Sequence, residues 1–277
     1  MNRSALSSGD RPTIDSRIIA HRGASSYAPE NTLAAFELAA EMGATKIELD
    51  VDVTSDGHLV VLHDPRVDRT SDGMGWARDF TLAELRVLNF DRGFEGQFAR
   101  AVTRIPTLSE VLSFAAERGV WVNIETKDFT NSWGAVNDLV AAEVRAHDGV
   151  DSTLISSINH RAIAGFARSY PEFTTAIAFV ETFADLPGYA RRCGANVLHP
   201  HFSLINERFV AEAREHGLGI NAWTVDDDAA ADRILEFDID GLMSNRPDVG
   251  NVQNRGVDNR GDQHPPHSTS HDTEARA

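Results

Sequence analysis

Two carboxylates and a histidine stand out in the segment KIELDVDVTSDGHLVVLHDP, which otherwise has the composition of a hydrophobic hairpin. Glu48 and Asp50 are two residues apart, so a β-strand would place both side chains on the same face. A two-residue turn at Asp56-Gly57 would pair Asp50 with His63 on the returning strand, and the three groups would converge. The alternative interpretation is a solvated strand face that carries these polar groups without chemical purpose.

Other apolar runs also end in ionisable residues. His21 and Arg22 follow RIIA, and Glu125 and Lys127 close WVNIETK. A single histidine at a strand end is more often a packed core residue, but three neighbouring strands that all end in charge favour a site. Buried charges are costly unless they are paired or bind a metal.

The residue types indicate which ligands such a site would hold. Glu48, Asp50 and Glu125 offer only hard oxygen ligands, which suit Mg²⁺ or Ca²⁺ and not zinc. Three carboxylates around a divalent cation leave a charge of about −1, which Arg22 and Lys127 would make positive, so that an anion could bind.

Four further side chains have open interpretations. Lys127 could be a Schiff-base lysine, because a desolvated lysine can lose its proton, although the neighbouring Glu125 argues against that role. Trp223 either packs at the rim of the fold or offers a face to the substrate. His199 and His201 are expected at the rim, mainly in structural roles.

Strand–helix alternation predicts the fold that positions these residues. Apolar runs alternate with helical patterns from residue 18 to about residue 245. The predicted strands, eight in number, are RIIAH, KIELDV, WVNIE, TLISSI, TTAIAF, NVLHPH, GINAWTV and GLMSN. This pattern and a length of 277 residues predict an α/β fold, the (β/α)₈ TIM barrel, with LVVLH as the return arm of a hairpin. A six-stranded open sheet is the alternative.

Domain boundaries follow from changes in composition. We expect a barrel over residues 16–250, with residues 66–105 as a small inserted lid after the hairpin of the second strand. Residues 251–277 are polar and are expected to form a disordered tail. Active sites in such barrels lie at the carboxyl ends of the strands, where the residues named above are predicted to be.

Two helices carry local signals. One is expected from about Thr32, and Glu30 and Asn31 before it either cap this helix or brace the site. A second is expected between the capping-box pattern that begins at Thr107 and a stop at Gly119.

Composition excludes several classes of function. The net charge of −16 repels nucleic acid and anionic membranes, and no apolar run is long enough to cross a bilayer. No secretory signal is evident, so a cytoplasmic location is expected. Cys193 is the only cysteine, which excludes an internal disulfide and a thiolate metal site. The acidic, lysine-poor composition fits either a salt-loaded cytoplasm or a GC-rich genome.

Several segments resemble the glycerophosphodiester phosphodiesterase family, part of the barrel superfamily that includes phosphoinositide-specific phospholipase C. They occur in the family's order from about residue 18 to residue 248, and are AHRGASSYAPENTLAAF, IELDVDVTSDGHLVVLHD, RT at Arg69-Thr70, IPTLSEVL, NIETK, AWTVDD and SNRPD. In the closing motif, Asn245 stands where the family usually has Asp, and Ser244 replaces Thr. This departure affects local bracing or substrate preference and leaves the expected reaction in place.

The resemblance implies a role for each predicted site residue. It implies a divalent cation held by the three carboxylates, acid/base roles for His21 and His63, and phosphate contacts from Arg22 and Lys127. Acid/base catalysis by this pair requires one neutral and one protonated histidine. We assign His21 as the neutral base and His63 as the protonated acid.

The expected function is metal-dependent hydrolysis of small-molecule glycerophosphodiesters to sn-glycerol 3-phosphate and an alcohol. No protein nucleophile is apparent, so the attacking oxygen is expected to come from water or from a hydroxyl of the substrate. The resemblance to the phospholipase C superfamily implies the substrate hydroxyl, and hence a cyclic phosphate intermediate. The alternatives are a phospholipase D-like enzyme acting on lysophospholipids and a catalytically silent barrel that binds phosphorylated metabolites. No particular oligomeric state is predicted.

Overall fold

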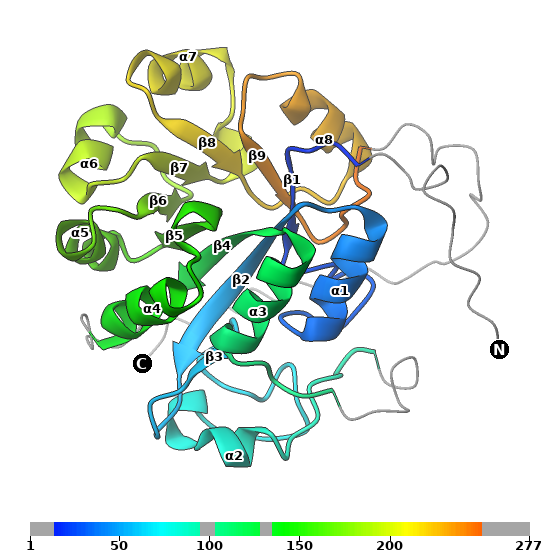
Figure 1. Cartoon of the computed structure of the whole chain (residues 1–277). Helices are drawn as coiled ribbons and strands as arrows, with labels where there is room; N and C mark the ends of the chain where they lie inside the picture. The colour runs from blue at the N-terminus through cyan, green and yellow to red at the C-terminus, as the bar shows by residue number, and fades with distance from the viewer. Residues whose placement is uncertain (1–13, 95–102, 128–134, 251–277) are drawn as a thin grey trace, which may run out of the picture.

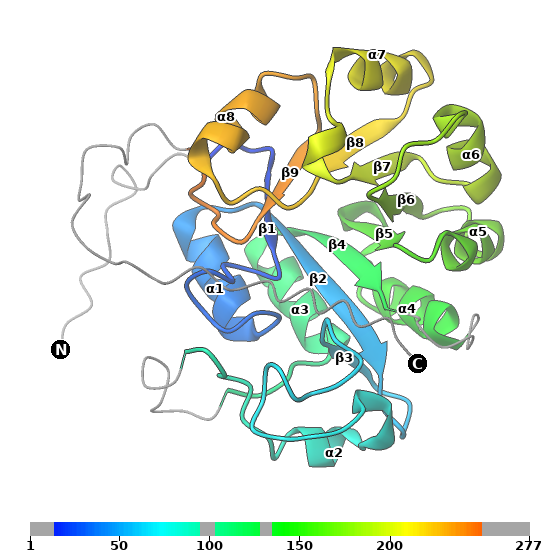
Figure 2. The ribbon, with the colours of Figure 1, turned by 180° about the vertical axis from the view of Figure 1, so that it is seen from behind.

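Eight parallel strands close into a barrel with helices around its outside (Figures 1 and 2). The computed structural model describes residues 14–94, 103–127 and 135–250. The barrel strands are β1 (Ile18–His21), β2 (Lys46–Val53), β4 (Trp121–Thr126), β5 (Thr153–Ser157), β6 (Thr174–Phe179), β7 (Val197–Pro200), β8 (Gly219–Ala222) and β9 (Gly241–Ser244). Strand β1 pairs in parallel with both β9 and β2, which closes the ring. The predicted (β/α)₈ TIM barrel is confirmed, and the open sheet is excluded.

The helical layer follows the predicted alternation. Its helices are α1 (Leu33–Met42), α3 (Leu108–Arg118), α4 (Ala135–Ala146), α5 (His160–Ser169), α6 (Leu186–Cys193), α7 (Glu207–Glu215) and α8 (Asp228–Leu235). None of the described helices is long and apolar enough to span a bilayer.

Helix ends lie where the local signals place them. The Thr32 hydroxyl accepts a hydrogen bond from the Ala35 N–H at 3.2 Å and so begins α1. The Thr107–Glu110 capping box begins α3, and Gly119 ends it in the left-handed conformation at φ 65°. These caps satisfy N–H and C=O groups that the helices themselves leave unpaired.

Strand β2 carries buried acids within an apolar sequence because its two faces have different surroundings. Ile47, Leu49 and Val51 are fully buried in the main hydrophobic core. Glu48 and Asp50 alternate with them and are only 1% exposed. The pleat of the strand therefore separates core packing from the polar groups.

The hairpin after β2 differs from the prediction by one residue. Strand β3 (Leu59–Val61) pairs antiparallel with β2, and its register sets Val51 opposite Val61. The Thr54 N–H donates to the His58 carbonyl at 2.9 Å, which leaves a three-residue loop, 55–57, in place of the predicted two-residue turn.

The conformation of Gly57 explains this loop. Gly57 takes the left-handed conformation at φ 85°, while Asp56 is not among the residues with positive φ. Both primed two-residue turns, types I′ and II′, need positive φ at the first central residue, which would be Asp56, whereas a three-residue loop needs it only at the glycine. Asp50 consequently lies opposite Leu62, whose N–H donates to the Asp50 carbonyl at 2.9 Å, and the predicted pairing with His63 is wrong.

The segment between β3 and α3 has a small hydrophobic core of its own. It contains a 3₁₀ turn η1 (Ala77–Asp79) and the short helix α2 (Leu82–Leu85). This core consists of Val60 of β3 together with Leu62, Val67, Ala77, Leu85, Phe90 and Ile105. The lid role of residues 66–105 stays a prediction, since residues 95–102 lie outside the described residues, as does the predicted tail over 251–277.

Candidate active site

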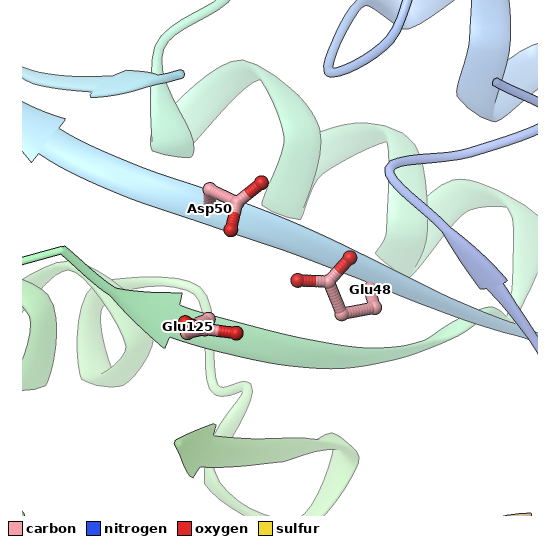
Figure 3. Close-up of side chains that lie close together, drawn as sticks. All are labelled: Glu48, Asp50 and Glu125. Carbon is pink, nitrogen blue, oxygen red and sulfur yellow. The ribbon is translucent and has the colours of Figure 1, made fainter. Parts of the chain in front are cut away.

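Strand register brings the predicted ionisable residues to one mouth of the barrel. His21 at the end of β1 is opposite Glu48 of β2, and Asp50 of β2 is opposite Glu125 of β4. One oxygen from each of Glu48, Asp50 and Glu125 lies within 4.8 Å of the others (Figure 3). The three carboxylates predicted as metal ligands therefore come together, although the hairpin register differs from the predicted one.

The three carboxylates fit a hard divalent cation. Among the described residues, Glu48 Oε1 has no hydrogen-bond partner although it is buried. Burial raises the pKa of Glu48, and the negative charges of Asp50 and Glu125 raise it further. A bound cation would relieve this repulsion, and an all-oxygen donor set suits Mg²⁺ or Ca²⁺.

Arg22 holds two of these carboxylates in place. Its backbone N–H donates to Glu48 Oε2 at 2.9 Å, and its Nε lies 3.2 Å from Asp50 Oδ2. The residue takes a left-handed φ of 57°, which turns the chain so that both contacts are made. Its Nη1 also donates to Glu30 Oε1 at 2.9 Å.

Lys127 approaches the carboxylates from the other side. Its Nζ lies 2.9 Å from Asp50 Oδ1 and donates a hydrogen bond to Glu125 Oε1. Burial alone would lower the pKa of Lys127, but the Asp50 and Glu125 carboxylates outweigh it and raise the pKa above the ordinary value. A charged ammonium is no nucleophile, which argues against the Schiff-base interpretation.

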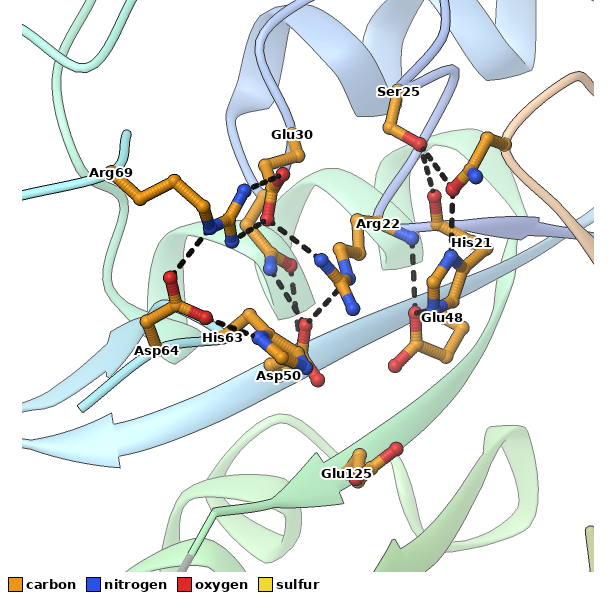
Figure 4. A network of polar contacts seen from close by, with 12 residues as sticks. His21, Arg22, Ser25, Glu30, Glu48, Asp50, His63, Asp64, Arg69 and Glu125 are labelled. Carbon is orange, nitrogen blue, oxygen red and sulfur yellow. Dashed lines mark hydrogen bonds and ion pairs between the residues drawn. The ribbon is translucent and has the colours of Figure 1, made fainter. Parts of the chain in front are cut away.

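A chain of ion pairs braces the site (Figure 4). Glu30 accepts hydrogen bonds from Arg69 at 2.6 and 2.8 Å, and Arg69 also donates to Asp64. The Asn31 side-chain amide donates to Asp50 Oδ2 at 2.8 Å. Glu30 and Asn31 are thus braces, while the helix cap is the next residue. Sequence reasoning left Asp64 and Arg69 without a role, although both belong to the quoted motifs.

The two histidines stand on opposite sides of the carboxylates. His21 Nε2 lies 3.9 Å from Glu48 Oε2, and its Nδ1 lies 2.7 Å from the Asn245 side-chain oxygen. Burial lowers the pKa of His21 to about 4, and the positive charge of Arg22 acts in the same direction. Figure 4 shows the His63 ring beside Asp50, with its Nδ1 2.6 Å from Asp64 Oδ1. With its pKa lowered in this way, the His21 ring is neutral near pH 7.

The other candidates lie around or beneath this cluster. Trp223 is half-buried just beyond β8, and its indole N–H donates to the His199 carbonyl at 2.7 Å. His201 lies 2.8 Å from the Ser203 hydroxyl at the rim, as predicted. The rim position predicted for His199 is wrong: its side chain is buried, because β7 directs it inward, where its Nε2 lies 3.1 Å from the Asn221 amide nitrogen. Cys193 is the last residue of α6.

Sequence reasoning missed two buried polar side chains that neighbour the carboxylates on adjacent strands. Asn123 is opposite Glu48 in the strand register, and Ser156 is opposite Glu125. Both are fully buried, and within the described parts of the chain neither side chain has a hydrogen-bond partner. Buried polar groups of this kind normally bind ordered water. The NIETK motif contains Asn123, and its two-residue spacing to Glu125 is the signal that could have identified it.

Comparisons with a family model and with curated proteins indicate the same family. Residues 21–249 match the glycerophosphoryl diester phosphodiesterase family. A glycerophosphodiester phosphodiesterase of Caldanaerobacter subterraneus is 35% identical over 232 residues, which are 84% of this chain and 95% of that protein. The glycerophosphodiester phosphodiesterase of Bacillus subtilis is 30% identical, with 91% of this chain and 92% of that protein covered.

Solved structures agree with these relatives. A glycerophosphodiester phosphodiesterase of Agrobacterium tumefaciens has a TM-score of 0.74 at 30% identity, over 85% of this chain and 98% of that one. An Oleispira antarctica phosphodiesterase, solved in complex with the product sn-glycerol 3-phosphate, has a TM-score of 0.79 at 28% identity, over 84% of this chain and 94% of that one. With its barrel, its acidic cluster and its flanking histidines, the chain belongs to the glycerophosphoryl diester phosphodiesterase family.

Proposed function

We propose that this protein is a metal-dependent phosphodiesterase that hydrolyses glycerophosphodiesters to sn-glycerol 3-phosphate and an alcohol. One observation carries the proposal: His21 and His63 flank a cluster of three carboxylates that also holds Arg22 and Lys127. The names of the curated relatives and the product bound to the Oleispira antarctica neighbour support the substrate class.

The chain's own cations bind the anionic phosphodiester. Arg22 and Lys127 lie on opposite sides of Asp50, so both can face a phosphate above the carboxylates. A divalent cation held by Glu48, Asp50 and Glu125 supplies further charge neutralisation when bound. The half-buried ring of Trp223, at the carboxyl end of β8, offers a face to the glycerol moiety.

Proton transfer is divided between the two histidines. His21, whose pKa is lowered to about 4 by burial and then by Arg22, is neutral near pH 7 and acts as the base. His63, oriented by Asp64 at 2.6 Å, donates a proton to the leaving alkoxide. The opposite roles require the two rings to differ in protonation state.

The nucleophile is the 2-hydroxyl of the substrate's glycerol. His21 removes its proton, the oxygen attacks phosphorus, and the bond from phosphorus to the alcohol oxygen breaks as His63 protonates that oxygen. Water then opens the resulting 1,2-cyclic phosphate with the histidine roles exchanged. Intramolecular attack has a large effective-molarity advantage, so an enzyme without its own nucleophile gains from it.

Release of sn-glycerol 3-phosphate tests the proposal directly. The protein should release it from glycerophosphocholine, excess EDTA should abolish the release, and Mg²⁺ or Ca²⁺ should restore it. Undiminished turnover in EDTA would exclude the metal, and no turnover of any glycerophosphodiester would favour a silent binding barrel. Faster cleavage of lysophosphatidylcholine than of glycerophosphocholine would favour the phospholipase D-like alternative.

A second assay tests the cyclic route. A substrate analogue that lacks the 2-hydroxyl should bind as an inhibitor and resist cleavage, whereas glycerol 1,2-cyclic phosphate should be hydrolysed. Comparable turnover of the deoxy analogue would identify water as the direct nucleophile.

A further inference from the structure

Asn245, just beyond β9, connects the catalytic His21 to a fixed carboxylate. Its Oδ1 lies 2.7 Å from His21 Nδ1, and its Nδ2 donates to Asp226 Oδ2 at 2.6 Å. The backbone N–H of Asn245 and the Ser244 hydroxyl donate to the other oxygen of Asp226, at 2.8 and 3.0 Å. Asp226 is therefore held by donors on both of its oxygens.

These contacts determine how the Asn245 amide is oriented. A carboxylate only accepts hydrogen bonds, so the amide nitrogen must face Asp226. The reversed orientation would set two oxygens 2.6 Å apart. The amide oxygen must then face His21 Nδ1, and at 2.7 Å this contact requires a proton on Nδ1.

We infer that Asn245, oriented by Asp226, is a positioning residue that fixes His21 as the tautomer with its proton on Nδ1 and a free lone pair on Nε2. Nε2 is the ring atom that faces the site, since it lies 3.9 Å from Glu48 Oε2. The opposite tautomer would present an N–H where a base is needed. The catalytic meaning of this inference, though not the tautomer itself, rests on the proposed function.

Ser25 supports the same arrangement (Figure 4). Its hydroxyl oxygen lies 2.8 Å from Asn245 Oδ1 and 2.7 Å from the His21 carbonyl oxygen. The single hydroxyl proton is therefore shared between these two acceptors. A hydroxyl can also accept a hydrogen bond, so Ser25 holds the amide in place while Asp226 sets its direction. Asn245 thus orients the imidazole through a neutral amide, without adding a negative charge beside the ring.

The sharpest test changes a residue that does not touch His21. Asp226→Asn keeps an oxygen for the backbone N–H of Asn245 but turns an NH₂ group toward the Asn245 amide. Two opposed donors should reverse the Asn245 amide, which then donates to Nδ1 and moves the His21 proton to Nε2. We expect kcat to fall by about 10²–10⁴, the usual contribution of a general base, with KM nearly unchanged.

A double variant should restore the native tautomer. Asn245→Asp alone would place two carboxylates against each other, whereas Asn245→Asp with Asp226→Asn exchanges donor and acceptor and again presents an oxygen to Nδ1. We expect Nδ1 protonation and most of kcat to return. If Asp226→Asn fails to fold, Asn245→Ala removes the acceptor without altering Asp226 and should give a mixture of tautomers.

Two-bond ¹⁵N–¹H correlation spectra of histidine-labelled protein, recorded with Mg²⁺ and without substrate, report the tautomer. The signals of His21 are assigned by their loss in His21→Gln. The exposed Asp238→Asn, on the outer surface where it pairs with Arg214, is the matched control and should change neither tautomer nor kcat.

The outcomes separate this inference from the proposed function. An Nε2 proton on His21 in the unaltered protein would overturn the inference, as would Asp226→Asn with Nδ1 protonation retained, whether or not kcat falls. If the unaltered protein hydrolyses no glycerophosphodiester, the proposed function fails, while the spectra still decide the tautomer.

Discussion

The buried ring of His199 makes a quantitative prediction about folding and pH. His199 is 1% exposed inside the barrel, and its Nε2 accepts a hydrogen bond from the Asn221 amide at 3.1 Å. Burial lowers the pKa of His199 to about 3, because a charged imidazole would lose its hydration there. The folded protein therefore keeps this ring neutral in mildly acidic buffer.

The sign and size of the effect follow from linkage. In the unfolded chain the histidine titrates near its ordinary pKa of about 6.5. As the pH falls below that value, the unfolded state takes up a proton that the folded state refuses, so stability declines until the pH reaches the folded-state pKa near 3. Between pH 7.5 and pH 5.0 the loss is about 2 kcal/mol, and any folded-state pKa below about 4 gives nearly the same value.

Replacement of His199 by Gln should remove this loss while keeping a hydrogen-bond acceptor for Asn221. Urea unfolding of both proteins in EDTA, at pH 7.5 and pH 5.0, measures it. Whatever Gln costs at pH 7.5, the free energy of unfolding of the variant should improve relative to the unaltered protein by about 2 kcal/mol at pH 5.0.

The matched control is His216→Gln, because the His216 ring lies at the surface at the end of α7. Its ring is hydrated in the folded as in the unfolded protein, so this variant should track the unaltered protein at both pH values. If the unfolding free energies of His199→Gln and the unaltered protein changed by the same amount between pH 7.5 and pH 5.0, the conclusion that His199 is kept neutral by burial would be refuted.

Further predictions concern the site and the surface. Glu125→Gln removes one ligand from the barrel rim without touching the core, so activity should fall and need more Mg²⁺ while the Tm is retained; an unchanged Mg²⁺ requirement would contradict the ligand assignment. His63→Ala should lower kcat by about 10²–10⁴ on glycerophosphocholine and less on a nitrophenyl ester, because nitrophenol leaves without a proton. An equal loss on both would assign His63 to the side of the nucleophile. The net charge of −16 makes the folded chain repel itself, and added salt screens this repulsion, so the Tm should rise with salt concentration. A Tm that is already maximal in dilute buffer would argue against a salt-adapted surface.

Local patterns in the sequence determined most of the barrel and the composition of its site. The strands that form the barrel follow from apolar runs, and the start of α1 and both ends of α3 follow from Thr32, Thr107 and Gly119. The two-residue spacing of Glu48 and Asp50 places both on one face of β2 whatever the surrounding fold. These features depend on residues that are near neighbours in the chain, so a pattern can reveal them.

Contacts between distant residues were decided only by the tertiary structure. Asn245 meets His21 across 224 positions, and Arg69 meets Glu30 across 39. No periodicity encodes these pairs. Pairing of β1 with β9 brings Asn245 to His21, and the segment after β3 brings Arg69 to the connection that carries Glu30. The hairpin register was likewise decided by the backbone that Gly57 adopts, and the inward direction of His199 by the pleat of β7. The sequence by itself determined which groups can do chemistry here, and packing around the closed barrel decided which of them touch and which nitrogen of His21 carries a proton.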